Sequence, residues 1–248
     1  DAITIETVEY ASTYWVKRGN SSTYAVAPFG KALKLNGTSD FTTLGSVTVS
    51  GDITLQAWVY LEALPGNNLY PRIFDLSAGI GRKGLRLLYT NNGTLALGYS
   101  DESGANQHVG NYDSVSGSIT AGSWMHIAAT VSGTGEVKFY KNGVALDMQP
   151  SNGTIWPNWA TEFSNVTWSS VLVGKSIYGD GFVNGSVNDV RIYDSERTLQ
   201  QIRADMQGAI DTNDTNLLAY YTFDGTLASG KTGGTAASMN AGAATYSS

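Results

Sequence analysis

The sequence predicts an all-β protein built as a two-sheet antiparallel sandwich with one short helix. Strand-like runs recur along the chain, glycine-containing turns separate these runs, and only one segment shows helical periodicity. Many short strands without alternating helices are typical of sandwiches, because parallel sheets need a helical crossover between strands.

The predicted strands combine β-branched or aromatic residues with two-residue alternation. They span residues 32–37, 53–62, 72–77, 85–90, 94–100, 124–131, 136–144, 171–176, 187–194 and 217–223. Between them lie Asn-Gly and Asp-Gly dipeptides at 92–93, 142–143 and 180–181. Such dipeptides supply the positive φ that tight hairpins require.

The helix is predicted over residues 195–207, with Ser195 as its N-cap. Leu199, Ile202 and Met206 recur at helical spacing, so one face is apolar and is expected to cover an end or edge of the sandwich. The last twenty residues are rich in Gly, Ala, Ser and Thr and are expected to be irregular.

Composition narrows the class of protein. The 248 residues, 42% of them hydrophobic, suffice for one large core, so we expect a single domain over 1–248. A net charge of −6 without a basic cluster argues against nucleic-acid binding. With no cysteine, disulfides and thiol chemistry are excluded. No apolar run reaches the roughly 20 residues of a membrane span.

Five segments, taken together and in order, resemble a known family. They are GKALKLNGTSDF (30–41), ITLQAWVYLE (53–62), SWMHIAATVSGTGEVKFYKNGV (123–144), GSVNDVRIYDSERTLQQI (185–202) and NLLAYYTFDG (216–225). The set resembles the LamG-like jelly roll of the laminin G and concanavalin A-like lectin superfamily. The resemblance implies a jelly-roll core over residues 30–225, and the fold alone does not define a function.

The resemblance also implies a calcium ion. In related jelly rolls the acid before the VRIY-type strand helps to bind a structural Ca²⁺, which would make Asp189 a ligand, with Gly37 and Asp40 in the loop after the first strand. A later loop carries calcium ligands in pentraxin-like relatives, and here it offers Asp180 and Asn184. Carboxylate and carbonyl oxygens are suitable ligands for Ca²⁺. The alternative is that Asp189 caps a turn or pairs with Arg191 or Arg197.

Catalytic patterns are missing from the sequence. Retaining glycoside hydrolysis needs two carboxylates on one strand face, and the closest pair of glutamates, Glu6 and Glu9, is three residues apart and would point to opposite faces. His126 lies inside a family motif and is interpreted as structural. We therefore expect a protein that is not an enzyme.

The candidate ligand-binding residues are aromatic or polar and lie between the predicted strands: Asn67, Asn68, Tyr70, Arg72, Asp101, His108, Trp156, Trp159, Tyr178 and Asn184. Aromatic rings next to amides are suited to sugars, because the ring stacks on C–H groups while amides bind hydroxyls. The alternative for the tryptophans is that they cover one end of the core.

The sequence thus favours a non-enzymatic, calcium-dependent, lectin-like module that binds a glycan or cell-surface polysaccharide. We expect it to belong to a larger multidomain adhesin, secreted or on the cell surface. The first alternative is a structural or protein-interaction module in which calcium only stabilises the fold. The second is a degenerate glycan hydrolase.

Overall fold

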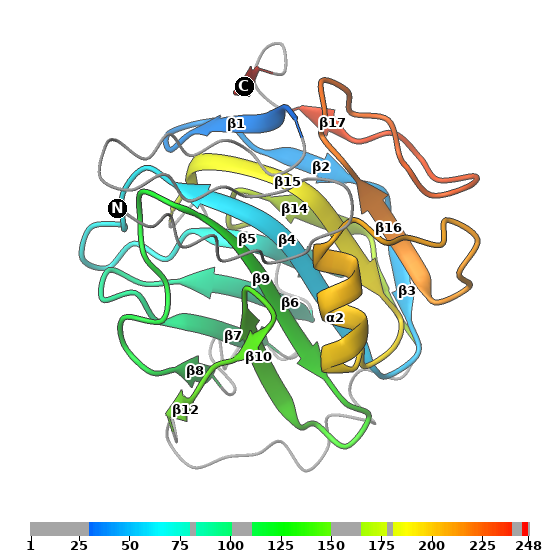
Figure 1. Cartoon of the computed structure of the whole chain (residues 1–248), viewed down its shortest axis with the longest axis horizontal. Helices are drawn as coiled ribbons and strands as arrows, with labels where there is room; N and C mark the ends of the chain where they lie inside the picture. Colours follow the sequence, from blue (N-terminus) through cyan, green and yellow to red (C-terminus); the bar gives the residue numbers. More distant parts are fainter. Residues whose placement is uncertain are drawn as a thin grey trace, which may run out of the picture.

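The strands expected from the sequence form two antiparallel sheets that pack face to face (Figure 1). The structure is a computed structural model, and it describes residues 30–79, 83–100, 111–149, 165–177, 181–239 and 245–247. The all-β jelly-roll sandwich with a short helix is therefore confirmed. Within the described residues, no helix has the length and hydropathy needed to span a membrane.

The first sheet is centred on β4 and β15, which contact each other along most of their lengths. In spatial order its strands are β11 (Val144–Ala145), β10 (Val137–Lys141), β9 (Trp124–Val131), β4 (Ile53–Leu61), β15 (Asn184–Tyr193), β1 (Ala32–Asn36) and β18 (Tyr246–Ser247), with β16 (Leu217–Tyr221) also paired to β15. The beginning of β15 pairs with β1, and its end pairs with β16. One long strand therefore connects strands that come from the beginning and the end of the segment 30–225.

The second sheet lies behind the first. Its order is β12 (Met148–Gln149), β8 (Asn111–Ser114), β7 (Leu95–Ser100), β6 (Gly84–Tyr89), β5 (Arg72–Ser77), β14 (Ser170–Val173), β2 (Thr42–Leu44) and β17 (Ser238–Met239). A separate pair joins β13 (Val166–Trp168) to β3 (Val47–Val49). The terminal segment, expected to be irregular, contributes the two-residue strands β17 and β18.

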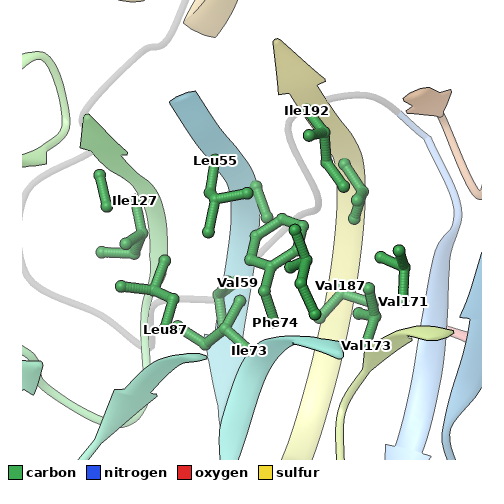
Figure 2. Close-up of a cluster of buried hydrophobic side chains, with 14 of the residues drawn as sticks. Leu55, Val59, Ile73, Phe74, Leu87, Ile127, Val171, Val173, Val187 and Ile192 are labelled. Atoms are coloured by element: carbon green, nitrogen blue, oxygen red, sulfur yellow. The ribbon is translucent and has the colours of Figure 1, made fainter. Parts of the chain in front are cut away.

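The core lies between the facing surfaces of the two sheets (Figure 2). Leu55 and Val59 of β4 point into it from one side, and Phe74 of β5 and Leu87 of β6 point into it from the other. Side chains alternate along a strand, so every second residue enters this layer. Complete burial of each such side chain contributes about 1.5–3 kcal/mol, which makes this layer the main source of stability.

The helix α2 (Leu199–Met206) lies across the first sheet (Figure 1). Its N-cap is Thr198 rather than Ser195, so the predicted start was three residues early. The backbone N–H of Gln201 donates to Thr198 Oγ1 (3.3 Å), and the backbone N–H of Thr198 donates to Gln201 Oε1 (2.8 Å). This capping box satisfies two donors that the first turn leaves without partners, and it fixes where the helix begins. The carbonyl of Ser195 instead accepts a hydrogen bond from Thr54 Oγ1 (2.6 Å).

Charged side chains are buried between the first sheet and α2. Arg191 of β15 donates from Nε to Asp189 Oδ1 and from Nη2 to Asp189 Oδ2, both at 2.9 Å. Both residues are at most 4% exposed. Burial disfavours the charged guanidinium, yet the carboxylate of Asp189 outweighs this effect and holds the pKa of Arg191 above its ordinary value. The two hydrogen bonds give the geometry of a bidentate ion pair.

A second carboxylate connects this pair to the helix. Asp205 of α2 accepts hydrogen bonds from Arg197 (2.7 and 3.0 Å) and from Gln56 of β4 (2.8 Å). Arg191 Nη1 lies 3.3 Å from the same carboxylate. We refer to Asp189, Arg191, Arg197 and Asp205 as the charge network, and it attaches α2 to β4 and β15.

His126 of β9 is buried on the same side of the first sheet and is 1% exposed. Its ring meets that of Trp58 edge-on at 5.5 Å, and Nδ1 has no hydrogen-bond partner among the described residues. Burial, reinforced by the positive charge of Arg191, lowers the pKa of His126 to about 3. The imidazole is therefore neutral in the folded protein at physiological pH, which confirms a structural position inside the motif.

Replacing His126 by Gln should remove part of the acid sensitivity of the fold. In the unfolded chain a histidine titrates at about pH 6.5, so above that pH neither state binds the proton and the residue has no effect. Below it only the unfolded state is protonated, and the free energy of unfolding should fall by about 1.4 kcal/mol per pH unit towards pH 3. Urea titrations between pH 4 and 8 measure this slope.

The other histidine allows a comparison, since a His108→Gln variant makes the same change at a second position of the sequence. The His126→Gln variant should lose part of the acid slope of the original protein. An unchanged slope in the His126→Gln variant would contradict the assignment of a depressed pKa.

Candidate functional site: a pocket at the rim of the sandwich

Three loops converge at one rim of the sandwich. They follow β1 (residues 37–41), β4 (62–71) and β14, where the structure describes residues 174–177 and 181–183. Backbone hydrogen bonds connect them: the N–H of Gly37 donates to the carbonyl of Val183 (3.1 Å), and the N–H of Glu62 donates to that of Asn184 (3.0 Å). The loops are therefore fixed to the start of β15 and hold a defined position relative to one another.

A pocket of about 380 Å³ lies between these loops, and we call it the rim pocket. This volume lies within the range of small-molecule sites, roughly 300–1,000 Å³. Most of its walls are apolar side chains: Ala63, Leu64, Pro65, Leu69, Pro71 and Phe182. None of the described residues that line it is an acid, a base or a histidine. The lining that the structure describes can therefore bind a small molecule but offers no group for acid–base chemistry.

Tyr89 of β6 also lines the pocket, although it is only 1% exposed and belongs to the core. Burial raises the pKa of its phenol well above the ordinary value, and a backbone hydrogen bond with Asn184 acts in the opposite direction. The hydroxyl of Tyr89 is therefore buried and already hydrogen-bonded within the protein.

Polar groups lie at the outer part of the same rim. Asn184 and Thr38 line the pocket and are exposed. In the 62–71 loop, Tyr70 is 41% exposed, and Asn67 and Asn68 are exposed beside it. Asn67 Oδ1 accepts a hydrogen bond from Asn91 Nδ2 (2.5 Å), which positions its amide. The rim thus offers amides and one aromatic ring next to an apolar cavity.

Glycine is required where the loops approach most closely. Gly37 has φ +74°, and a Cβ placed there would lie 2.7 Å from the Cβ of Asn184. A larger residue would strain the backbone and push Asn184 out of its position in the pocket wall. The Asn-Gly turn after β1 therefore serves the shape of the pocket as well as the hairpin geometry.

The structure brings several predicted site residues together. Gly37 and Asn184 line the rim pocket, and Asn67, Asn68 and Tyr70 belong to the loop that forms one wall. Six other predicted residues lie outside the described residues: Asp101, His108, Trp156, Trp159, Tyr178 and Asp180.

Arg72 differs from the prediction. It is 3% exposed on β5, and its Nη1 donates to the backbone carbonyl of Tyr70. The guanidinium therefore supports the 62–71 loop from below and does not face solvent. All six residues of β5 are buried, so a residue on this strand is covered whichever way its side chain points.

The apolar lining was missed by the sequence analysis. Leu64, Leu69 and Phe182 form much of the pocket wall, yet only polar and aromatic residues of these loops were selected as candidates. An exposed leucine between turn residues, as in the segment LPGNNLYP at 64–71, is the signal that could have indicated it.

The residues expected to hold calcium do not fit one ion around Asp189. Asn184, at the level of Gly37, is five residues before Asp189 on β15, which corresponds to about 16 Å along the strand. Calcium ligands lie about 2.3–2.6 Å from the ion, so Asp189 and Gly37 cannot share it. Both carboxylate oxygens of Asp189 are also engaged by Arg191, and the alternative of an Arg191 ion pair is the arrangement found.

Asp40 is half-buried after the β1 turn and accepts a hydrogen bond from Ser39 Oγ (3.3 Å). Among the described residues, no group of three or more acids or histidines is arranged to hold a metal ion. A calcium site that includes Asp180 stays a prediction.

Comparison with known proteins identifies the superfamily of the chain. A family model described as the concanavalin A-like lectin/glucanases superfamily matches residues 36–203, about two thirds of the chain. The chain belongs to this superfamily. No curated protein sequence matches it.

Solved structures with a similar fold share little sequence with this superfamily member. A Bacteroides ovatus protein, assigned provisionally as carbohydrate-binding, has 18% identity and a TM-score of 0.60, and the match covers 88% of this chain and 60% of that one. Domain 4 of AbnA, a GH43 extracellular arabinanase from Geobacillus stearothermophilus solved with arabinotriose, has 22% identity and a TM-score of 0.52. That match covers 75% of this chain and 82% of the other. The chain thus spans about three fifths of the Bacteroides protein, and these likenesses show the fold.

An Asp189→Asn variant should lower the free energy of unfolding by about 3 kcal/mol, because Arg191 would remain buried without its bidentate carboxylate and would keep only the contact with Asp205. Asparagine tolerates the positive φ of this position (50°), so the backbone is preserved. Chemical denaturation should give the same loss in calcium and in chelator. A loss seen only in calcium would contradict the ion-pair assignment.

An Asp189→Asn, Arg191→Met double variant provides the control for this measurement. It removes both charges of the pair, so it should lose less stability than the sum of the two single changes.

Proposed function

We propose that this domain is a non-enzymatic carbohydrate-binding module that holds a sugar in the rim pocket. The observation that carries the proposal is the combination at one rim: an exposed Tyr70, the exposed amides of Asn67, Asn68 and Asn184, and an apolar cavity. A pyranose presents hydroxyls around its edge and C–H groups on its faces. Amides and an aromatic ring complement these two kinds of surface.

The fold supports the same proposal by analogy. Two proteins of similar fold are described as carbohydrate-binding or were solved with a bound oligosaccharide. Fold alone does not transfer function, so the proposal depends on the side chains of the pocket. Binding without cleavage is favoured because the described lining contains no acid pair, which glycoside hydrolysis requires.

The wider setting is part of the proposal. We place the module outside the cell, on a secreted or surface-attached protein with further domains, where it would bind a cell-surface polysaccharide. Calcium dependence, expected from the family resemblance, is retained only for a site near Asp180, and it is tested by measuring binding in calcium and in chelator.

The proposal predicts that Tyr70→Ala and Asn184→Ala each weaken glycan binding by about threefold to tenfold. A stacking ring and a direct hydrogen bond each contribute about 0.5–1.5 kcal/mol, and both residues are exposed enough to be replaced without unfolding. A glycan array identifies the ligand, and calorimetric titration measures the affinities.

Val144→Ala is the matched control, because Val144 is 60% exposed on β11 and does not line the pocket. Its affinity should equal that of the original protein. Failure to bind any glycan, in calcium or in chelator, would reject the carbohydrate-binding function and favour a structural module.

A further inference from the structure

We infer that the rim pocket selects a sugar that carries a methyl group, either a 6-deoxyhexose or an acetamido sugar. This inference rests on the proposed function and names the class of sugar that the pocket favours. It follows from how the polar and apolar atoms of the lining are distributed.

Many of the side chains that line the pocket offer nothing to a hydroxyl. Leu64, Leu69, Pro71 and Phe182 present only carbon atoms from their side chains. The phenol of Tyr89 is buried, and its hydroxyl is already hydrogen-bonded to the backbone of Asn184. A sugar hydroxyl placed against these side chains would lose its hydrogen bonds to water and gain none in return.

Two lining residues have exposed polar side chains. They are Asn184 and Thr38, and the backbone of Thr38 is fixed by the hydrogen bond from its N–H to Asn36 Oδ1 (2.9 Å). A ligand bound by these groups would turn its hydroxyls towards them. The part of the ligand that contacts the apolar side chains should then be apolar.

Common sugars have few groups that satisfy this condition. The C6 methyl of a 6-deoxyhexose and the acetyl methyl of an acetamido sugar are compact and apolar, whereas the ordinary hexose carries a hydroxyl at the same positions. Burying one methyl favours binding about fourfold, and leaving a buried hydroxyl without a partner adds to the difference. We therefore expect discrimination of about tenfold between a methyl-bearing sugar and its parent hexose.

Leu69 is the residue that tests the inference directly. It is 46% exposed at the tip of the 62–71 loop, and its backbone N–H donates to the carbonyl of Gly66 (3.3 Å), so the turn does not depend on the side chain. A Leu69→Asn change introduces a donor and an acceptor into the apolar wall and leaves the core untouched.

The experiment compares matched sugars, all joined through the anomeric oxygen to the same linker. The pairs are L-fucose with L-galactose, L-rhamnose with L-mannose, and N-acetyl-D-glucosamine with D-glucose. Binding of the complete chain is measured by calorimetry. At least one methyl-bearing member should bind about tenfold more tightly than its partner, and the deoxy or acetamido pair that shows the preference identifies the source of the methyl group.

Leu69→Asn should reduce this preference to about twofold or less, whereas Val144→Asn, a change of similar chemistry on an exposed strand away from the pocket, should preserve it. Equal affinity for both members of every pair would overturn the inference and leave carbohydrate binding intact. Absence of binding to any sugar would overturn the proposed function as well.

Discussion

The bidentate ion pair between Asp189 and Arg191 is the interaction on which the arrangement of the first sheet depends. It lies where the edge of β15 changes its partner from β1 to β16 and where Asp189 takes a positive φ. Two charges buried at such a kink are costly unless both are fully hydrogen-bonded, and each carboxylate oxygen of Asp189 accepts one bond. Since Arg191 also contacts Asp205, the kink and the position of α2 are fixed together.

The two ends of β15 have different tasks. The end near Asn184 carries the rim pocket, whereas the second half of the strand carries Asp189 and Arg191 of the charge network. Five residues separate Asn184 from Asp189, so the two regions are about 16 Å apart along the same strand. Charge is therefore concentrated where the helix is attached, and the described lining of the pocket is left uncharged and suited to a neutral ligand.

The sequence predicted the long elements well and the short ones poorly. β5 and β9 match their predicted bounds, because residues typical of turns, among them Pro71 and Gly122, flank each run. Two-residue strands such as β17 depend on tertiary pairing and have no local pattern. For the site, the family resemblance indicated Gly37 and the polar composition of the next loop indicated Asn68, but the apolar wall around Leu69 exists only because distant loops converge.

The loops of the rim are anchored by backbone hydrogen bonds, so the identity of their exposed side chains can vary. The N–H groups of Gly37 and Glu62 bond to carbonyls of the segment entering β15, so the frame of the opening is set without help from the exposed side chains at 69 and 70. Such positions can be exchanged freely while the sheets beneath keep their register. Sequence variation in evolution, or a combinatorial library, can thereby produce binding proteins for many different ligands on one scaffold.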